Sequence, residues 1–157
     1  KEILPSDKIV EMYYNIFMGI GRCNLTIYVK KHPNDTDLLF DEMIKEFNFV
    51  RIIKSNDSAE ILVSKFKPLC VLGGVTTSVF TIPVIYSIQT ISYMHLYLKF
   101  KELNPLYENR IKTLFSSFQN VSKKLHFISD ESQLRWLLLG ININGLAKQS
   151  EVRHCEN

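Results

Sequence analysis

The stretch PLCVLGGVTTSVFTIPVIYSIQTISYMHLYL, residues 68–98, contains no Asp, Glu, Lys or Arg. The rest of the chain is charged at an ordinary density, so this uncharged run indicates a segment that is shielded from water. It is long enough to test as a membrane-spanning helix, which needs about 20 apolar residues. Glycines, a proline and many hydroxyl side chains interrupt it, and lone polar groups are costly in hydrocarbon. We therefore expect residues 68–98 to form the interior of a folded domain, and we do not expect membrane insertion.

Within this run, residues 68–72 predict a short buried strand that ends at Gly73 and Gly74. Thr76, Thr77 or Ser78 is then expected to cap a helix. Residues 84–100 fit two patterns, because their apolar side chains recur at helical spacing and also alternate as in a strand.

Outside the run, segments with helical spacing alternate with segments rich in β-branched and aromatic residues. The expected helices are residues 8–20, with Ser6 and Asp7 as caps and Gly19 and Gly21 as the stop, then 37–47, a segment from Asn104-Pro105 to 118, and 131–141, capped by Ser129-Asp130. The expected strands are residues 23–29, 47–54 and 123–129. This order favours an α/β fold, a short and mostly parallel sheet with helices on its faces. The alternative is an all-α helical bundle, and strand-type composition favours α/β.

Two helical faces are predicted in more detail. The inward side chains are expected to be Leu39, Met43, Ile44 and Phe47 in the second helix, and Leu106, Ile111, Leu114, Phe115 and Phe118 in the helix after Asn104. Trp136 in the last helix is expected in the core.

Length and composition suit one domain, residues 1–157, that can bury a core without metal or disulfide links. The normal apolar content and the scarcity of Gly and Pro exclude a disordered or collagen-like protein. The formal net charge of +3 is small and scattered, which does not indicate a nucleic-acid-binding protein.

The cellular compartment is predicted from N-glycosylation acceptor patterns. Four asparagines, Asn24, Asn34, Asn56 and Asn120, each begin an Asn-x-Ser/Thr sequence, where composition predicts about one or two. The chain also starts at Lys1, as a mature product of signal cleavage or a trimmed chain would. We therefore expect a secreted or lumenal glycoprotein.

Three cysteines allow at most one internal disulfide. Cys70 lies in the most apolar predicted strand and is expected to be a buried thiol. Cys23 and Cys155 lie near segment ends and are the more plausible pair, whose long loop would add a few kcal/mol of stability. Because no Cys or His pair has the spacing of metal ligands, we expect no zinc site and no other metal or cofactor.

The best candidate for a binding site is VLGGVTTSV, residues 71–79. Here a buried strand and a glycine turn precede hydroxyl groups at the start of a helix, where free N–H groups attract an anion. The predicted ligand-binding residues are Gly73, Gly74, Thr76, Thr77 and Ser78. The Walker lysine and the GxGxxG pattern are both absent, and a capped turn without a ligand is the alternative interpretation.

Two acidic groups are weaker candidates. Asp35, Asp37, Asp41 and Glu42 surround a predicted helix start, where they could bind a hard cation or simply complement the helix dipole. Asp130 and Glu131 follow a predicted strand, where acid–base chemistry and helix capping are both possible. We expect the four histidines to be structural, and we assign no catalytic residue.

Two partial family resemblances follow from these segments. The order CNLTIYV, LLFDEMIKEF, VLGGVTTSV, ISY and LYENRIKTLFSS, within about residues 23–118, resembles the first lobe of type 1 bilobed extracellular ligand-binding receptors. That resemblance implies ligand contacts by Gly74, Thr76, Thr77 and Ser78. HLYLKFKELN, NRIKTLFSSF and KKLHFISDES, within about residues 95–132, are similar to the opening strand–helix–strand of family 8 glycosyltransferases, which implies part of a nucleotide-sugar site.

Our main functional hypothesis is a secreted or lumenal domain that binds an unknown protein or a small anionic ligand and does not catalyse a reaction. A glycosyltransferase-like protein, incomplete or degenerate, is the alternative. The third hypothesis is a small helical signalling or immune-modulating protein.

Overall fold

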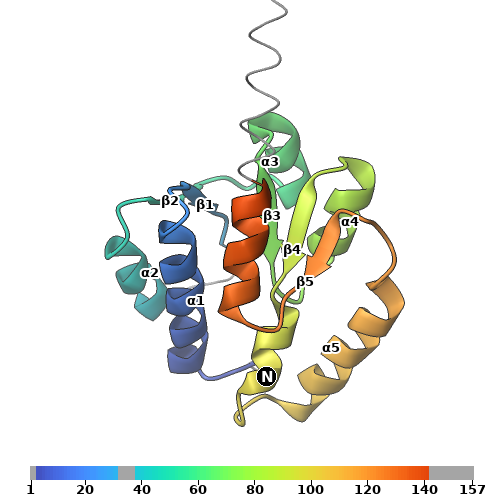
Figure 1. Cartoon of the computed structure of the whole chain (residues 1–157). Coiled ribbons are helices and arrows are strands. Elements are labelled where there is room, and N and C mark those ends of the chain that lie inside the picture. The colour runs from blue at the N-terminus through green and yellow to red at the C-terminus, as the bar shows by residue number, and fades with distance from the viewer. Residues whose placement is uncertain (1–2, 32–37, 142–157) are drawn as a thin grey trace, which may run out of the picture.

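The computed structural model describes residues 3–31 and 38–141, in which helices alternate with short parallel strands (Figure 1). The elements are α1 (Ser6–Gly21), β1 (Ile27–Val29), α2 (Leu38–Lys45), β2 (Val50–Ile52), α3 (Ala59–Phe66), β3 (Cys70–Gly73), α4 (Ser78–Ile85), β4 (Gln89–Ser92), the 3-10 helix η1 (Met94–Lys99), α5 (Pro105–Phe118) and β5 (Leu125–Phe127). A further helix covers residues 131–141. The predicted α/β class is therefore confirmed, and the all-α alternative is wrong.

The strands form two parallel sheets. β1 pairs with β2 so that Ile27 lies opposite Val50, and the second sheet has the order β3-β4-β5. In the second sheet Ser92 at the end of β4 lies opposite both Gly73 and Phe127. Across the view of Figure 1 the strand labels run β2, β1, β3, β4, β5. The three strands of the larger sheet consequently end at a common edge.

The uncharged run at residues 68–98 folds into β3, α4, β4 and η1. Thr90, Ile91 and Ser92 of the central strand β4 are fully buried. Ile82 of α4 and Met94 of η1 are equally inaccessible. The expected interior packing is therefore confirmed for β4 and much of α4 and η1, whereas Leu69 and the end of α4 at Val84 and Ile85 are exposed. Over the described ranges, no helix combines the length and the apolar character that a membrane crossing requires.

Segment 84–100 follows neither of the two predicted patterns along its whole length. α4 ends at Ile85, and Ser87 then has a left-handed backbone with φ of 52°. This break separates the helix from β4, and the chain continues into η1 directly after Tyr93. Three short elements with different repeats, α4, β4 and η1, therefore follow one another within residues 84–100, which is why the periodicity fitted two patterns.

The first helix is longer than predicted. Ser6 and Asp7 lie inside α1, whose N-cap position is Pro5 and has no side-chain cap bond. Gly19 lies inside α1 and does not end it, whereas Gly21 is its last residue. The prediction of Ser6 and Asp7 as caps was therefore wrong, and the predicted stop is confirmed at Gly21.

Helical faces were predicted with partial success. In α2, Met43 and Ile44 are buried as expected, but Phe40 is buried in place of Leu39. In α5, the Asn104 side chain accepts a hydrogen bond from the Leu106 amide at 3.1 Å, which confirms the predicted helix start. Leu106 itself is 68% exposed, because the first turn of α5 projects beyond the core.

Trp136 was expected in the core, but its side chain is 77% exposed on the helix over residues 131–141. Leu134 and Leu138 of that helix are buried instead. These two lie four residues apart on one helical face, and Trp136 lies halfway between them on the opposite face. The expectation for Trp136 was therefore wrong.

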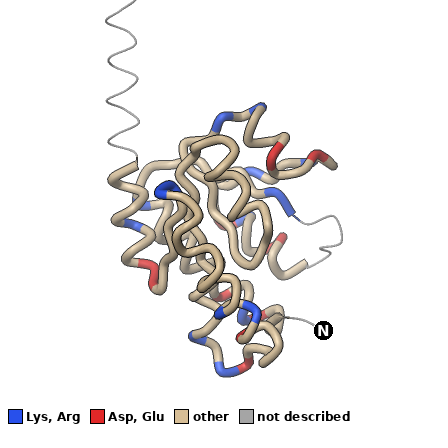
Figure 2. The backbone as a smooth tube through the Cα atoms, turned by 90° about the vertical axis from the view of Figure 1, so that its right-hand side faces the viewer, with Lys and Arg blue, Asp and Glu red and all other residues tan. Residues whose placement is uncertain are grey.

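Charged residues are distributed over the outside of the described chain. Figure 2 shows Lys and Arg positions interspersed with Asp and Glu positions. Several of these charges are paired, as in Lys31–Asp41 at 2.8 Å and Lys65–Asp57 at 2.6 Å. The Lys31–Asp41 pair is partly buried, whereas Lys65–Asp57 is exposed, and exposed pairs contribute little to stability.

Candidate ligand site at the carboxyl edge of the sheet

β3, β4 and β5 are parallel, so the segments that follow them leave the sheet at one edge, which we call the carboxyl edge. It consists of residues 74–78 after β3, 93–99 after β4 and 128–133 after β5. Ligands of open parallel sheets bind in the crevice outside the carboxyl ends of the strands. Two parts of the chain that were considered separately in the sequence, residues 73–78 and Asp130-Glu131, therefore belong to one edge.

The glycine turn after β3 is packed tightly. A Cβ atom at Gly74 would lie 2.8 Å from Cε2 of Tyr93 and 2.9 Å from the hydroxyl oxygen of Tyr97. A Cβ atom at Gly73 would collide with a methyl group of Val79. Neither glycine has a positive φ, so both are required by close approach of neighbours and not by a left-handed backbone.

The hydroxyl residues after the glycines differ in accessibility. Thr76 and Thr77 are exposed, and Thr77 occupies the N-cap position of α4 without a side-chain cap bond. Ser78 instead donates toward the Glu60 carboxylate, which also accepts a hydrogen bond from Thr81 at 3.1 Å. The open part of the predicted site is thus Thr76 and Thr77.

Glu60 comes from α3 and was not predicted as part of this region. Its own backbone amide and the hydroxyls of Ser78, Thr81 and Ser58 hold the pKa of this carboxyl below its usual value. A carboxylate at the first turn of α4 complements the positive end of that helix. An anionic ligand at Ser78 would therefore have to compete with Glu60.

A cluster of tyrosines closes the interior side of the carboxyl edge. The hydroxyl groups of Tyr13 in α1 and Tyr93 after β4 are 2.9 Å apart, and their rings meet edge to face. Burial raises the pKa of Tyr93 and of Tyr97 well above the usual value, so both phenols stay neutral. The cluster holds α1 against the end of β4 and against Gly74.

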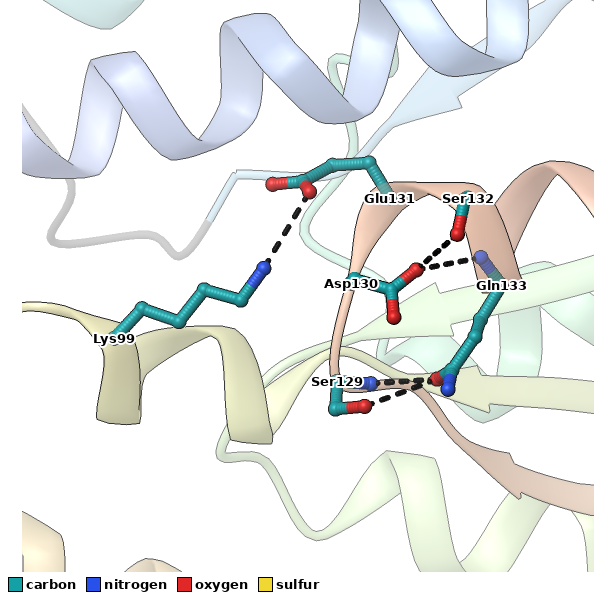
Figure 3. Close-up of polar contacts among 6 residues, drawn as sticks. All are labelled: Lys99, Ser129, Asp130, Glu131, Ser132 and Gln133. Carbon is teal, nitrogen blue, oxygen red and sulfur yellow. Dashed lines mark hydrogen bonds and ion pairs between the residues drawn. The ribbon is translucent and has the colours of Figure 1, made fainter.

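The segment after β5 is ordered by a cap (Figure 3). The Asp130 carboxylate accepts hydrogen bonds from the Gln133 amide at 2.9 Å and from the Ser132 hydroxyl. Gln133 reaches back, and its side-chain oxygen accepts from the Ser129 amide at 2.8 Å. The predicted cap at Ser129-Asp130 is therefore present, and the Ser132 hydroxyl is the main cause of a lowered pKa for Asp130.

Lys99 and Glu131 bring the segments after β4 and β5 together. Lys99 lies at the end of η1, and its Nζ is 3.5 Å from Oε2 of Glu131 (Figure 3). Both side chains are partly exposed, so the pair is accessible from solvent. No local pattern in the sequence marks Lys99 as part of a site. Its role follows from the parallel pairing of β4 and β5.

A shallow hollow lies beside β5. This hollow of about 590 Å³ is lined by residues of α5, β5 and the helix over residues 131–141, including Phe115, His126 and Trp136. His126 hydrogen-bonds Gln89 at 2.8 Å, and His95 packs on the ring of Phe115. Burial lowers the pKa of both histidines, which fits the structural roles expected for them.

The predicted glycosylation and acidic sites lie only partly within the residues that the structure describes. Asn24, Asn56 and Asn120 are exposed, whereas Asn34 lies outside the described residues. Within the described ranges no group of three His, Cys, Asp or Glu side chains is arranged to hold a metal ion. Two members of the acidic group, Asp35 and Asp37, have Asp-x-Asp spacing and also lie outside those ranges.

The thiols of Cys23 and Cys70 are free, and Cys155 lies outside the described residues. The Cys23–Cys155 disulfide therefore stays a prediction. Cys23 is buried near the end of α1, and Cys70 is half-buried on β3. Burial raises the pKa of Cys70 to about 12, so this thiol is unreactive at neutral pH.

Comparison with known families identifies the chain. A model of the alpha-2,8-polysialyltransferase (POLYST) family matches residues 1–95, more than half of the 157 residues. The chain belongs to the alpha-2,8-polysialyltransferase family. The matched part of this polysialyltransferase-family chain contains β1 to β4 and residues 73–78, whereas Lys99 and Glu131 lie beyond it. No curated protein matches the chain.

The match corrects both resemblances drawn from the sequence. It is to a glycosyltransferase family, which agrees with the broader class of the second resemblance, but not to family 8. It gives no support to the bilobed receptors. It also favours the alternative functional hypothesis, a glycosyltransferase-like protein, over a non-catalytic binding domain.

Proposed function

We propose that this chain forms the donor-binding part of a glycosyltransferase that adds sialic acid in α-2,8 linkage. The observation that carries the proposal is the family match over residues 1–95, which includes the glycine turn of the carboxyl edge. The donor class is a nucleotide-activated sialic acid, which is also a small anionic ligand of the kind expected from the sequence.

The reaction sets three requirements. The 8-hydroxyl oxygen of a terminal sialic acid forms a bond to the anomeric carbon of the activated sugar, and the bond from that carbon to the nucleotide phosphate breaks. The phosphate leaves with the electron pair, and the hydroxyl proton passes to a base. A site for this chemistry needs donors for the leaving phosphate, a carboxylate for the proton and groups that orient both substrates.

The carboxyl edge supplies groups of each kind. Thr76 and Thr77 are exposed donors after β3, and Lys99 is an exposed cation after β4. The carboxylate of Asp130 is held by its cap, whereas Glu131 contacts Lys99 at the long distance of 3.5 Å. We therefore assign Lys99 to the leaving phosphate and Glu131 to the proton. Adjacent strands are about 4.8 Å apart, so one nucleotide-sugar can reach from β3 to β5.

The proposal also includes a secreted or lumenal location for the protein. Three acceptor asparagines, Asn24, Asn56 and Asn120, are exposed and can carry a glycan without loss of core packing. Transfer of sialic acid to glycans is compatible with the secreted or lumenal location expected from these sites. Intact mass before and after enzymatic glycan removal, on protein from secreting cells, tests it. An unchanged mass contradicts this location.

Titration calorimetry with a nucleotide-activated sialic acid tests the donor site. Lys99→Ala is expected to weaken binding about tenfold, because it removes a charge-assisted contact to phosphate. Lys112→Ala is the matched control, since Lys112 pairs with Glu108 at 2.6 Å on the exposed face of α5. Equal affinity of the two variants, or no binding by the unaltered chain, contradicts the proposal.

Glu131→Gln separates binding from chemistry. Because the amide keeps the size of the side chain but cannot accept a proton at neutral pH, donor affinity is expected to stay within about threefold. Transfer to a fluorescent oligosialic acid is expected to fall by about 100-fold or more, the usual contribution of a general base. Retained transfer contradicts the role of Glu131.

A further inference from the structure

Each of the two sheets has an apolar edge strand, β1 in one and β3 in the other, and these two are neighbours in the view of Figure 1. Among residues 3–31 and 38–141, β1 pairs only with β2, and β3 has β4 as its one neighbour. β1 reads Ile-Tyr-Val and β3 reads Cys-Val-Leu-Gly, without the charges or prolines that normally protect a sheet edge. Residues 90–92 of β4 are fully buried, whereas the residues of β1 and β3 are half-buried or exposed, apart from Gly73. Unprotected apolar edges of this kind indicate that a neighbouring strand is missing from both.

Backbone hydrogen bonds show which groups point into the space between the sheets. Ile27 donates to the Phe49 carbonyl at 2.9 Å and Val29 accepts from Ile53 at 2.8 Å, so both residues face β2. The amide of Tyr28 between them points the other way. On β3, the Gly73 carbonyl accepts from Tyr93 at 3.0 Å, so Gly73 faces β4 and the amide of Leu72 points away from it.

The order of elements gives the direction of the missing strand. β2, β3 and β4 each follow a helix that itself follows a strand, and β5 follows β4 through η1 and α5. α1 is the helix that leads into β1. The carbonyl of Ile3, just before α1, accepts from the Asn104 amide at 3.1 Å, beyond η1 at the carboxyl edge. A strand that leads into α1 would therefore end at that edge and run parallel to β1 and β3. A right-handed crossover through α1 then places it beside β1.

We propose that one more parallel strand, which leads directly into α1 in the same polypeptide, completes a continuous sheet between β1 and β3. The strand order becomes β2-β1-new strand-β3-β4-β5. In that order the direction of winding reverses between the new strand and β3, and ligands of doubly wound sheets bind at such a point. The glycine turn at residues 73–78 lies there. The proposal goes beyond the donor chemistry and stands independently of it.

Amide hydrogen exchange on an extended chain tests the proposal without any ligand. The extension Val-Ile-Val-Val-Ile-Gly-Ser is placed ahead of Lys1, because a strand buried on both faces is continuously apolar. The amides of Tyr28 and Leu72 are expected to exchange about tenfold more slowly than in the unextended chain, since each gains a buried backbone hydrogen bond. Phe127 is the internal control: its amide points away from β4 at the opposite edge, so its exchange should not change.

A second extension with Pro in place of the central Val cannot complete the ladder and is expected to give no protection. The proposal is overturned if both extensions act alike, or if protection appears at Phe127 in place of Tyr28 and Leu72. It is also overturned if these two amides are already protected in the unextended chain. If that protection is lost on removal of residues 142–157, those residues occupy the edge. If it is lost on dilution, a second copy of the chain occupies it.

Discussion

The hydroxyl oxygen of Tyr13 in α1 lies 2.9 Å from that of Tyr93, one residue after β4. This bond joins elements that are 80 residues apart in the chain and fixes α1 across the carboxyl edge. Because Tyr93 is buried, water does not take the place of this hydrogen bond. The tyrosine contact therefore connects the helix packing to the candidate site.

Tyr93→Phe is expected to lower the free energy of unfolding by about 1 kcal/mol, because a buried hydrogen bond is lost while the ring packing stays. Urea denaturation measures this change. Tyr14→Phe, at a more exposed position of α1, should have almost no effect on the free energy of unfolding. If the two variants are equally stable, the Tyr13–Tyr93 bond contributes nothing.

Gly74→Ala should destabilise the fold by about 1–3 kcal/mol, because the new methyl group must displace the rings of Tyr93 and Tyr97. Gly19→Ala is the matched control. A Cβ atom at Gly19 meets no atom within 4 Å and lies inside α1, so this variant should gain about 0.5–1 kcal/mol. Thermal unfolding of both variants shows the sign directly. A neutral Gly74→Ala would mean that the turn is looser than described.

Asp130 should make stability depend on pH. Its pKa in the folded protein is lowered, first by the Ser132 hydroxyl and then by the Gln133 amide. A lowered pKa adds stability above the unfolded value of about 3.9, and that stability is lost as pH falls through the folded value. Asp130→Asn, which keeps a capping side chain, should therefore melt below the unaltered protein at pH 7.

The difference in melting temperature between Asp130→Asn and the unaltered protein should shrink between pH 4 and pH 2, since the native carboxyl is then protonated as well. Melting curves across this range test the assignment. A difference that is constant with pH would show that the charge of Asp130 has no part in the cap.

Cys70 should react slowly in the native protein. With a pKa raised to about 12, almost none of the thiol is ionised at pH 8. Alkylation followed by peptide mass analysis should give a native rate at least about tenfold below that in urea, where the pKa returns to about 8.5. Similar rates in both conditions would contradict the raised pKa of this thiol.

The alternation of helices and strands could be predicted because most segments have a local signal. Asn104-Pro105 marks the start of α5, and Ser129-Asp130 marks the start of the last helix. Helical faces were harder to predict. Leu106 and Trp136 are apolar yet exposed. Their exposure could not be predicted, because neither sequence spacing nor hydrophobicity indicates where the core ends.

The candidate site was predicted only in part. The glycine turn was found because its residues are adjacent in the sequence. Lys99 and Glu131 are 32 residues apart and meet only through the parallel pairing of β4 and β5. Glu60 in α3 accepts a hydrogen bond from Thr81 in α4, 21 residues later, because these two helices pack together. Contacts of this kind depend on strand order, which one sequence does not reveal.

The central claim is that the carboxyl edge binds a nucleotide-activated sialic acid. The most direct test is a nuclear magnetic resonance titration that follows backbone amide shifts residue by residue as this donor is added. We expect saturable changes at Gly74, Thr77, Lys99 and Ser129, with none at Lys112 on α5. Changes confined to other surfaces, or no change at any of these amides, would contradict the account.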